Sequence, residues 1–135
     1  MKKKNCKCEF ASQRSELLLK NFRESIARQS KISAMRAFRE ATETPAPRFW
    51  VSEARATRII NMMMKGADIL ESMQTEKRKM YVEIYKRVMK LREENPGMPL
   101  GDAVFEVVNQ PAPCFYLAPV SAKNLINKAK RENRK

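Results

Sequence analysis

Arg55, Arg58 and Asn61 follow one another at intervals of three residues in a segment that also has helical apolar spacing. On a helix, residues three apart lie on one face, so Arg55 and Arg58 could reach the same surface. A guanidinium can bond two acceptors of guanine, and an asparagine amide can read the edge of an adenine. Asn61 could equally cap a neighbouring loop, which is the interpretation we favour for it. The chemistry that this face predicts is contact with base edges and phosphates.

A second segment carries a related but different polar set. Lys123 and Lys128 are placed to hold a phosphate backbone, because a lysine ammonium is a compact charge with no planar fork. Asn124 is short and uncharged, and Asn127 has the same two alternatives as Asn61, base contact or capping. We therefore expect sequence preference from the first segment and general affinity from the second.

These two segments belong to a repeat within the chain. Residues 45–61 read PAPRFWVSEARATRIIN and residues 111–127 read PAPCFYLAPVSAKNLIN, which gives seven identities without a gap at a period of 66 residues. Only two such units fit into 135 residues. The P-x-P-x-F-[WY] pattern of the two boxes resembles that of small basic proteins from gut anaerobes and their phages, for which no activity is known. The resemblance covers the two boxes and implies no mechanism.

Each box predicts an extended segment followed by a helix. The residue before a proline is kept out of the α region, so the two prolines of each box hold the chain extended. Phe49 and Phe115 are expected as core anchors. Trp50 and Tyr116 have two alternatives: their ring faces could stack on bases or on a partner, or they could occupy half-buried sites with their polar edge exposed.

The start of the helix after each box can be placed. Ser52 is a favourable N-cap, and Glu53 would then occupy the first helical position, where a carboxylate interacts well with the helix dipole. The residue aligned with Glu53 is Pro119, and proline is favoured at that position. The sequence therefore predicts helices that begin at 53 and 119.

The fold class predicted is all-α, with two tandem pseudo-symmetric repeats of three helices. Apolar residues at helical spacing predict helices over about 13–29, 33–42 and 53–65, and one long helix over 67–94. The last two helices of each repeat resemble a helix-turn-helix, although about nine residues separate them instead of three or four. The expected organisation is a flexible basic arm (1–11), repeat 1 (12–66), a helical linker (67–75), repeat 2 (76–130) and a basic tail (131–135).

Composition and charge favour a polyanion as the partner. The net charge is +13, from 28 Lys and Arg against 15 Asp and Glu, and much of the excess lies at the two ends of the chain. No segment is apolar enough to span a membrane, and Cys6, Cys8 and Cys114 suit a reducing compartment. We therefore expect a cytoplasmic protein, associated with the nucleoid or, if encoded by a phage, with the virion.

Several kinds of catalytic and cofactor site are excluded by residue types. The chain has no histidine, so it can form neither a Ser-His-Asp nor a Cys-His nucleophile arrangement. Its three glycines make neither a phosphate-binding loop nor a dinucleotide fingerprint, and its cysteines cannot complete a four-ligand zinc site. We expect no enzymatic activity, no cofactor and no metal.

The function predicted is non-enzymatic nucleic-acid binding, with duplex DNA preferred as the ligand. The alternative is a structural or protein-interaction module of a phage or mobile element. In that case the segment 62–64, three consecutive methionines, and the aromatic pair of the boxes would form the contacts. Self-association is compatible with either prediction.

Overall fold

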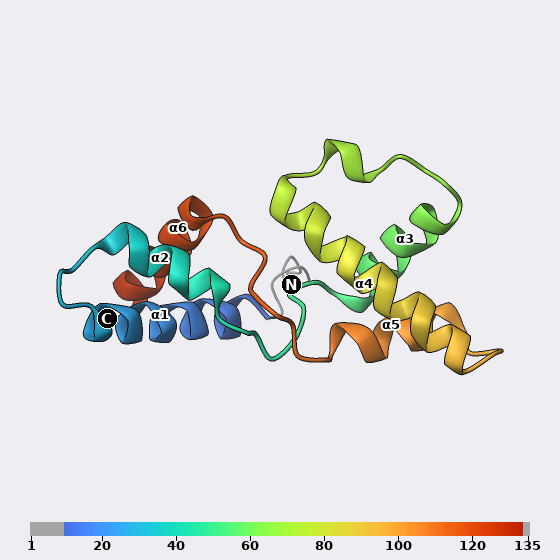
Figure 1. The fold of residues 1–135 in the computed structure, drawn as a ribbon, viewed down its shortest axis with the longest axis horizontal. Coiled ribbons are helices and arrows are strands. Elements are labelled where there is room, and N and C mark those ends of the chain that lie inside the picture. Colours follow the sequence, from blue (N-terminus) through green and yellow to red (C-terminus); the bar gives the residue numbers. More distant parts are fainter. Residues whose placement is uncertain (1–9, 134–135) are drawn as a thin grey trace, which may run out of the picture. The chain divides into compact units, whose positions relative to one another are not determined.

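All regular elements in the described part of this protein are helical. The computed structural model describes residues 10–133 (Figure 1). The elements are α1 (Ala11–Arg28), α2 (Ala34–Glu43), α3 (Glu53–Met64), the short 3-10 helix η2 (Leu70–Ser72), α4 (Thr75–Glu94), α5 (Leu100–Val108) and α6 (Pro119–Asn133). Within the described range, sheet-like pairing is limited to one isolated antiparallel bridge between Ala46 and Ala112. The predicted all-α class is confirmed.

The helix starts follow the period of the sequence repeat. Helices α2 and α5 begin at residues 34 and 100, and helices α3 and α6 begin at residues 53 and 119, so both pairs are 66 residues apart. The hydroxyl of Ser52 accepts a hydrogen bond from the amide of Arg55 at 3.2 Å, as expected of an N-cap. Pro119 is the first residue of α6. The predicted starts at 53 and 119 are confirmed.

The segment before α4 is not the continuous helix that was predicted over 67–94. Gly66 follows α3 with a φ of +82°, and only Leu70–Ser72 form a short 3-10 turn before α4 begins at Thr75. Ile69 and Met73, which suggested the helical stripe, are only half-buried. Because short helices are maintained mainly by burial of an apolar face, this segment has little to keep it helical. The predicted helical linker over 67–75 is therefore wrong.

The terminal arm and tail fall mostly outside the described residues. Residues 1–9 of the predicted arm and residues 134–135 of the predicted tail are among those that the structure does not describe. Where the description begins and ends, α1 already starts at Ala11 and α6 continues to Asn133. The helices therefore extend into both segments that were predicted to lie outside the folded body.

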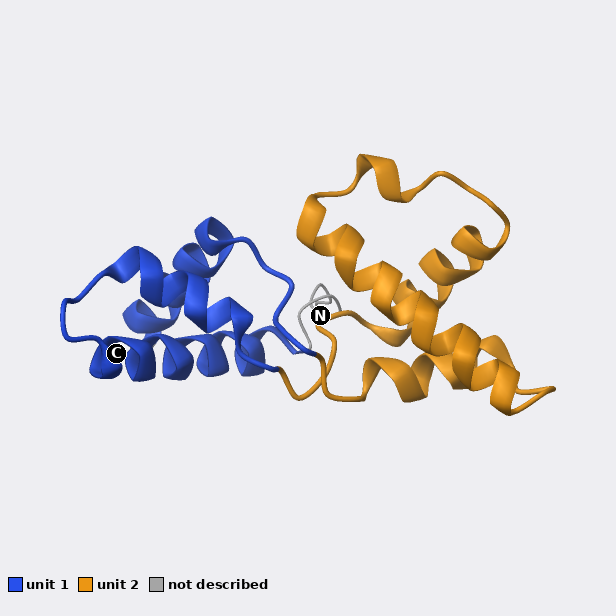
Figure 2. Ribbon diagram, viewed as in Figure 1, with its two compact units in different colours: residues 1–45, 113–135 blue, residues 46–112 orange. Residues whose placement is uncertain are grey.

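The chain forms two compact units, and they do not correspond to the predicted contiguous repeats. Unit 1 comprises residues 1–45 and 113–135, and unit 2 comprises residues 46–112 (Figure 2). Helix α6 packs on α1 and α2, whereas α3 packs on α5 and α4. The last helix of each sequence repeat thus completes the unit built by the other repeat. The predicted domains 12–66 and 76–130 are corrected accordingly, and α2 and α3, which were predicted to pair as in a helix-turn-helix, belong to different units.

Each unit has its own apolar core. In unit 1, the rings of Phe22 and Phe38 stack with centroids 4.8 Å apart. The other buried side chains of this core come from α1, α2, α6 and the second box: Leu18, Leu19, Ala37, Ala41, Phe115, Ala122, Ile126 and Ala129. The core of unit 2 is assembled in the same way, from Phe49, Ala56, Ile59, Ile60, Met80, Tyr81, Ile84, Val88, Ala103, Val104, Val107 and Val108. The prediction that Phe49 and Phe115 are core anchors is confirmed.

Two segments, 44–52 and 109–118, carry the chain from one unit to the other, and we call them the crossing segments. The amides of Ala46 and Ala112 each donate to the other residue's carbonyl, at 2.9 and 2.8 Å. The amide of Phe49 donates to the carbonyl of Val108 at 3.0 Å, and the aligned amide of Phe115 donates to the carbonyl of Thr42 at 2.8 Å. Proline-rich extended backbone leads the chain away from the helix it has just left, which accounts for the exchange of the final helices.

Candidate nucleic-acid interface

Helix α3 presents its two arginines to solvent. Arg55 and Arg58 are exposed and Asn61 is half-buried, whereas Ala56 and Ile60 on the opposite face are fully buried. The apolar side of the helix is fixed against α4 and α5, so its polar side must point outward. The structure thus brings Arg55, Arg58 and Asn61 together on one helix of unit 2.

The arginines of α3 also lie close to a tyrosine of α4. Tyr81 is 1% exposed. Burial raises the pKa of Tyr81 above its ordinary value of 10.0, and a hydrogen bond with the Arg55 guanidinium opposes this rise, as does the charge of Arg58. Arg55 and Arg58 therefore lie close to the Tyr81 hydroxyl, where α3 packs on α4. Nothing in the sequence indicates this contact, since the η2 region separates Arg55 from Tyr81 along the chain.

Helix α6 presents the second predicted set, in unit 1. Lys123, Asn124 and Lys128 are exposed and Asn127 is half-buried, with Ile126 fully buried on the other side. Lys128 borders a shallow depression between α6 and the first turns of α1. Hydroxyls and carboxylates contribute to its lining, and the other lining residues are Ala11, Ser12, Ser15, Glu16, Leu125, Ala129 and Glu132. The two predicted groups of site residues are therefore carried by different units.

The two aromatic residues of the boxes have different surroundings. Trp50 is 7% exposed, so its ring has no accessible face for a base. Of the two alternatives for Trp50, the structure supports burial. Tyr116 is half-buried, and its backbone lies in the left-handed region with a φ of 54°. This conformation is uncommon for residues other than glycine, and Trp50, the residue aligned with Tyr116 in the first box, does not adopt it.

The ion pairs of the described residues leave α3 and α6 uninvolved. They join Arg28 and Arg36 to Glu40, Lys79 to Glu76, and Arg87 to Glu83. All of these residues belong to α1, α2 or α4. Within the described part of the chain, Arg58, Lys123 and Lys128 thus form no ion pair. Arg55 lies beside Tyr81, and the ammonium of Lys130 lies over the ring of Phe22, 4.5 Å from its centroid.

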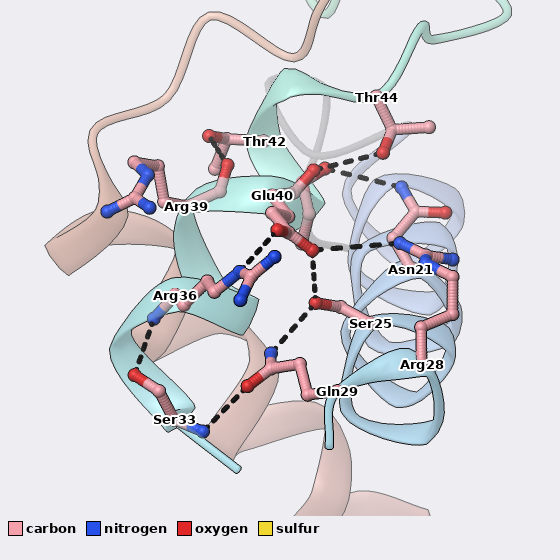
Figure 3. A network of polar contacts seen from close by, with 11 residues as sticks. Asn21, Ser25, Arg28, Gln29, Ser33, Arg36, Arg39, Glu40, Thr42 and Thr44 are labelled. Carbon is pink, nitrogen blue, oxygen red and sulfur yellow. Dashed lines mark hydrogen bonds and ion pairs between the residues drawn. The ribbon is translucent and has the colours of Figure 1, made fainter. Parts of the chain in front are cut away.

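A polar network that sequence reasoning missed joins α1 to α2 (Figure 3). The hydroxyl of Ser25, which is fully buried, donates to Oε1 of Glu40 at 2.5 Å, and Nε of Arg36 donates to Oε2 at 2.8 Å. Gln29 donates to the Ser25 oxygen at 3.2 Å and accepts from the Ser33 amide at 2.7 Å. The signal available in the sequence was a serine on the apolar stripe of α1, which needs a hydrogen-bond partner when buried.

The electrostatics of this network indicate a structural role. The hydrogen bonds from Ser25 and then Arg36 hold the pKa of Glu40 below its usual value of 4.5, with smaller contributions from the charges of Arg36 and Arg28. The carboxylate therefore stays ionised at neutral pH and neutralises arginine charge next to it. A general acid or base would need a pKa near the working pH, which is the opposite direction.

The exchange of helices gathers most of the net charge in one unit. The sequence segments of unit 1 contain 17 Lys and Arg against 6 Asp and Glu, a net charge of +11. Those of unit 2 contain 11 against 9, a net charge of +2. Both ends of the chain belong to unit 1, because α6 returns to pack on α1. The charge that the sequence placed at two distant ends is thus attached to a single unit.

No family model, curated protein or solved structure matches this chain. Among the described residues, no three His, Cys, Asp or Glu side chains are grouped so that they could hold a metal ion. In the same part of the chain, none of the helices has both the length and the apolar character that crossing a bilayer would require.

Proposed function

We propose that this protein binds nucleic acid without catalysing a reaction, that duplex DNA is its preferred ligand, and that it acts in the cytoplasm or on the nucleoid. The observation that carries the proposal is the pair of helices α3 and α6. Each buries its apolar side in a unit and exposes basic and amide side chains that form no ion pair within the described residues. Such side chains suit phosphates and base edges.

The net charge supports the same proposal and predicts how binding depends on salt. Each phosphate neutralised by a Lys or Arg contributes a slope of roughly −0.9 in log K against log salt for duplex DNA. With a net charge of +11 in unit 1, several phosphate contacts are available. We expect affinity to fall steeply between low and moderate salt.

The two helices have different roles in this proposal. Arg55 and Arg58 supply sequence preference, because a bidentate arginine–guanine contact discriminates by about 1–3 kcal/mol. Lys123 and Lys128 supply affinity that does not depend on sequence. Arg55→Ala with Arg58→Ala is therefore expected to flatten preference among duplexes, and Lys123→Ala with Lys128→Ala to weaken all duplexes by a similar factor.

The test is fluorescence anisotropy with a panel of labelled duplexes over a range of salt concentrations. Two control variants remove the same charge from other exposed surfaces of the same units. Lys86→Ala with Lys90→Ala, on α4, is the control for α3, and Lys20→Ala with Arg23→Ala, on α1, is the control for α6. Circular dichroism first establishes that each variant retains its helices. Affinity that is independent of salt, or controls that reproduce the site variants, would contradict the proposal.

A second candidate function is a protein-interaction or particle-structural role, as in a phage or mobile element. It is favoured by the methionines that follow the buried part of α3: Met62 and Met63 are half-buried, and Met64 is 41% exposed. Methionine side chains adapt to varied apolar partners. This function predicts a complex that survives high salt and that Met64→Gln disrupts, whereas DNA binding would be unaffected by this neutral substitution.

A further inference from the structure

The helices that complete the two units have nearly the same docking face. On α3 the packed positions include Ala56 and Ile60, and on α6 the residues aligned with them are Ala122 and Ile126, identical in type and all fully buried. Each helix is preceded by a buried phenylalanine of its box, at the same distance along the chain. Helix α3 is joined to α4 within unit 2, whereas α6 docks on α1 and α2, from which the whole of unit 2 separates it along the chain.

We propose that the groove between α1 and α2 is a docking site for α6 of a second copy of this chain. In the resulting dimer, α6 of each chain would complete unit 1 of the other chain. This proposal concerns self-association and does not depend on nucleic-acid binding.

The contacts that hold α6 in its own chain would be the same between two chains. They include the buried side chains Phe115, Ala122 and Ile126, and the hydrogen bond from the Phe115 amide to the Thr42 carbonyl. The closed single chain and the exchanged dimer therefore differ mainly in entropy, because α6 is tethered to the groove it fills in the first and belongs to another chain in the second. Short linkers give effective concentrations in the millimolar range, so we expect closed single chains to dominate at micromolar concentration and exchanged dimers to become comparable near about 1 mM.

Release of α6 need not disturb unit 2. Unit 2 is one continuous stretch, 46–112, whose two ends are joined by the paired backbone hydrogen bonds of Ala46 and Ala112. Arg48 further holds the first crossing segment, donating to the carbonyls of Phe49 and Val51 at 2.8 and 2.7 Å. Unit 1, by contrast, is made of two separate stretches of chain and is completed only by α6, so α6 is the helix that we expect to exchange.

Two full-length variants with complementary defects test the proposal. Ile126→Asp places a charge on the buried face of α6 and leaves the groove intact, whereas Leu18→Asp places a charge in the core under the groove and leaves α6 intact. When the two variants are mixed in equal amounts, the intact α6 of the Leu18→Asp chain can dock only on the intact groove of the Ile126→Asp chain. We expect a one-to-one complex in native mass spectrometry, and recovery of hydrogen-exchange protection in α1 and α2 of the Ile126→Asp chain.

The matched control mixes Ile126→Asp with Ala122→Asp, which both damage α6, so no intact α6 is present and protection should not recover. If the complementary mixture behaves like this control, the proposal is overturned. Should either charged variant fail to fold at all, wild-type chains decide. Light and heavy isotope-labelled chains are unfolded together and refolded at increasing concentration up to about 1 mM. Mixed-label dimers whose fraction rises with concentration support the proposal, and monomers alone at every concentration refute it.

Discussion

Replacement of Phe115 by alanine would test which helices the second box anchors. Phe115 is 2% exposed, lies in unit 1, and bonds through its amide to Thr42 at the end of α2. Removing a buried phenylalanine side chain costs about 3–5 kcal/mol, through lost transfer free energy and the cavity that remains. Since each 1.4 kcal/mol is a factor of ten, the opening equilibrium of unit 1 should rise between about a hundredfold and a few thousandfold.

Hydrogen exchange measured by mass spectrometry assigns that loss to particular helices. In Phe115→Ala, protection should fall in α1, α2 and α6 and stay unchanged in α4 and α5. The matched variant Phe49→Ala, at a 0% exposed position of unit 2, should show the opposite distribution. Contiguous repeats would give the reverse result for both variants. Loss of protection in α4 and α5 of Phe115→Ala would therefore refute the exchange of helices.

Three further outcomes follow from the side-chain contacts. The pKa of Glu40 is lowered in the folded chain, so the ionised carboxylate stabilises the fold above pH 4.5, and this stabilisation is lost as the pH falls through the lowered pKa. Glu40→Gln should reduce this acid dependence of the melting temperature in thermal melts. Tyr81 has a raised pKa, so the folded state loses stability as the pH rises beyond 10.0 through the raised pKa, and Tyr81→Phe should remove this loss in alkaline melts. Arg48→Ala deletes two charged hydrogen bonds and should destabilise unit 2 by about 1–3 kcal/mol in urea unfolding, with α1 and α2 unaffected.

The local features of the fold could be predicted because each depends on neighbouring residues. Ser52 caps α3 through its own hydroxyl, and Pro119 begins α6 because its fixed φ suits a first helical turn. The outward direction of Arg55 and Lys123 follows from the apolar stripe on the other side of each helix. The error over 67–75 is also local: Ile69 and Met73 have helical spacing, but the sequence does not show that they remain only half-buried.

The exchange of helices could not be predicted because the two grooves accept nearly the same face. Ala56 and Ile60 have the same types as Ala122 and Ile126, so the apolar pattern is satisfied whichever unit each helix completes. The choice depends on the extended crossing segments, whose direction is a tertiary property. For the same reason the contact of Arg55 with Tyr81 was missed, and the burial of Trp50 remained one of two alternatives.

The return of α6 to the first unit has a consequence for synthesis on the ribosome. Unit 2 is a continuous stretch and can fold once residue 112 has left the exit tunnel, whereas α1 and α2 must wait for α6. Roughly 90 residues separate the end of α2 at Glu43 from the end of α6 at Asn133. At about 5–20 residues per second, the apolar surfaces of α1 and α2 are left without α6 for about 5–18 s in every nascent chain. During that interval a neighbouring nascent chain on the same message, or a chaperone, can reach the groove before α6 does.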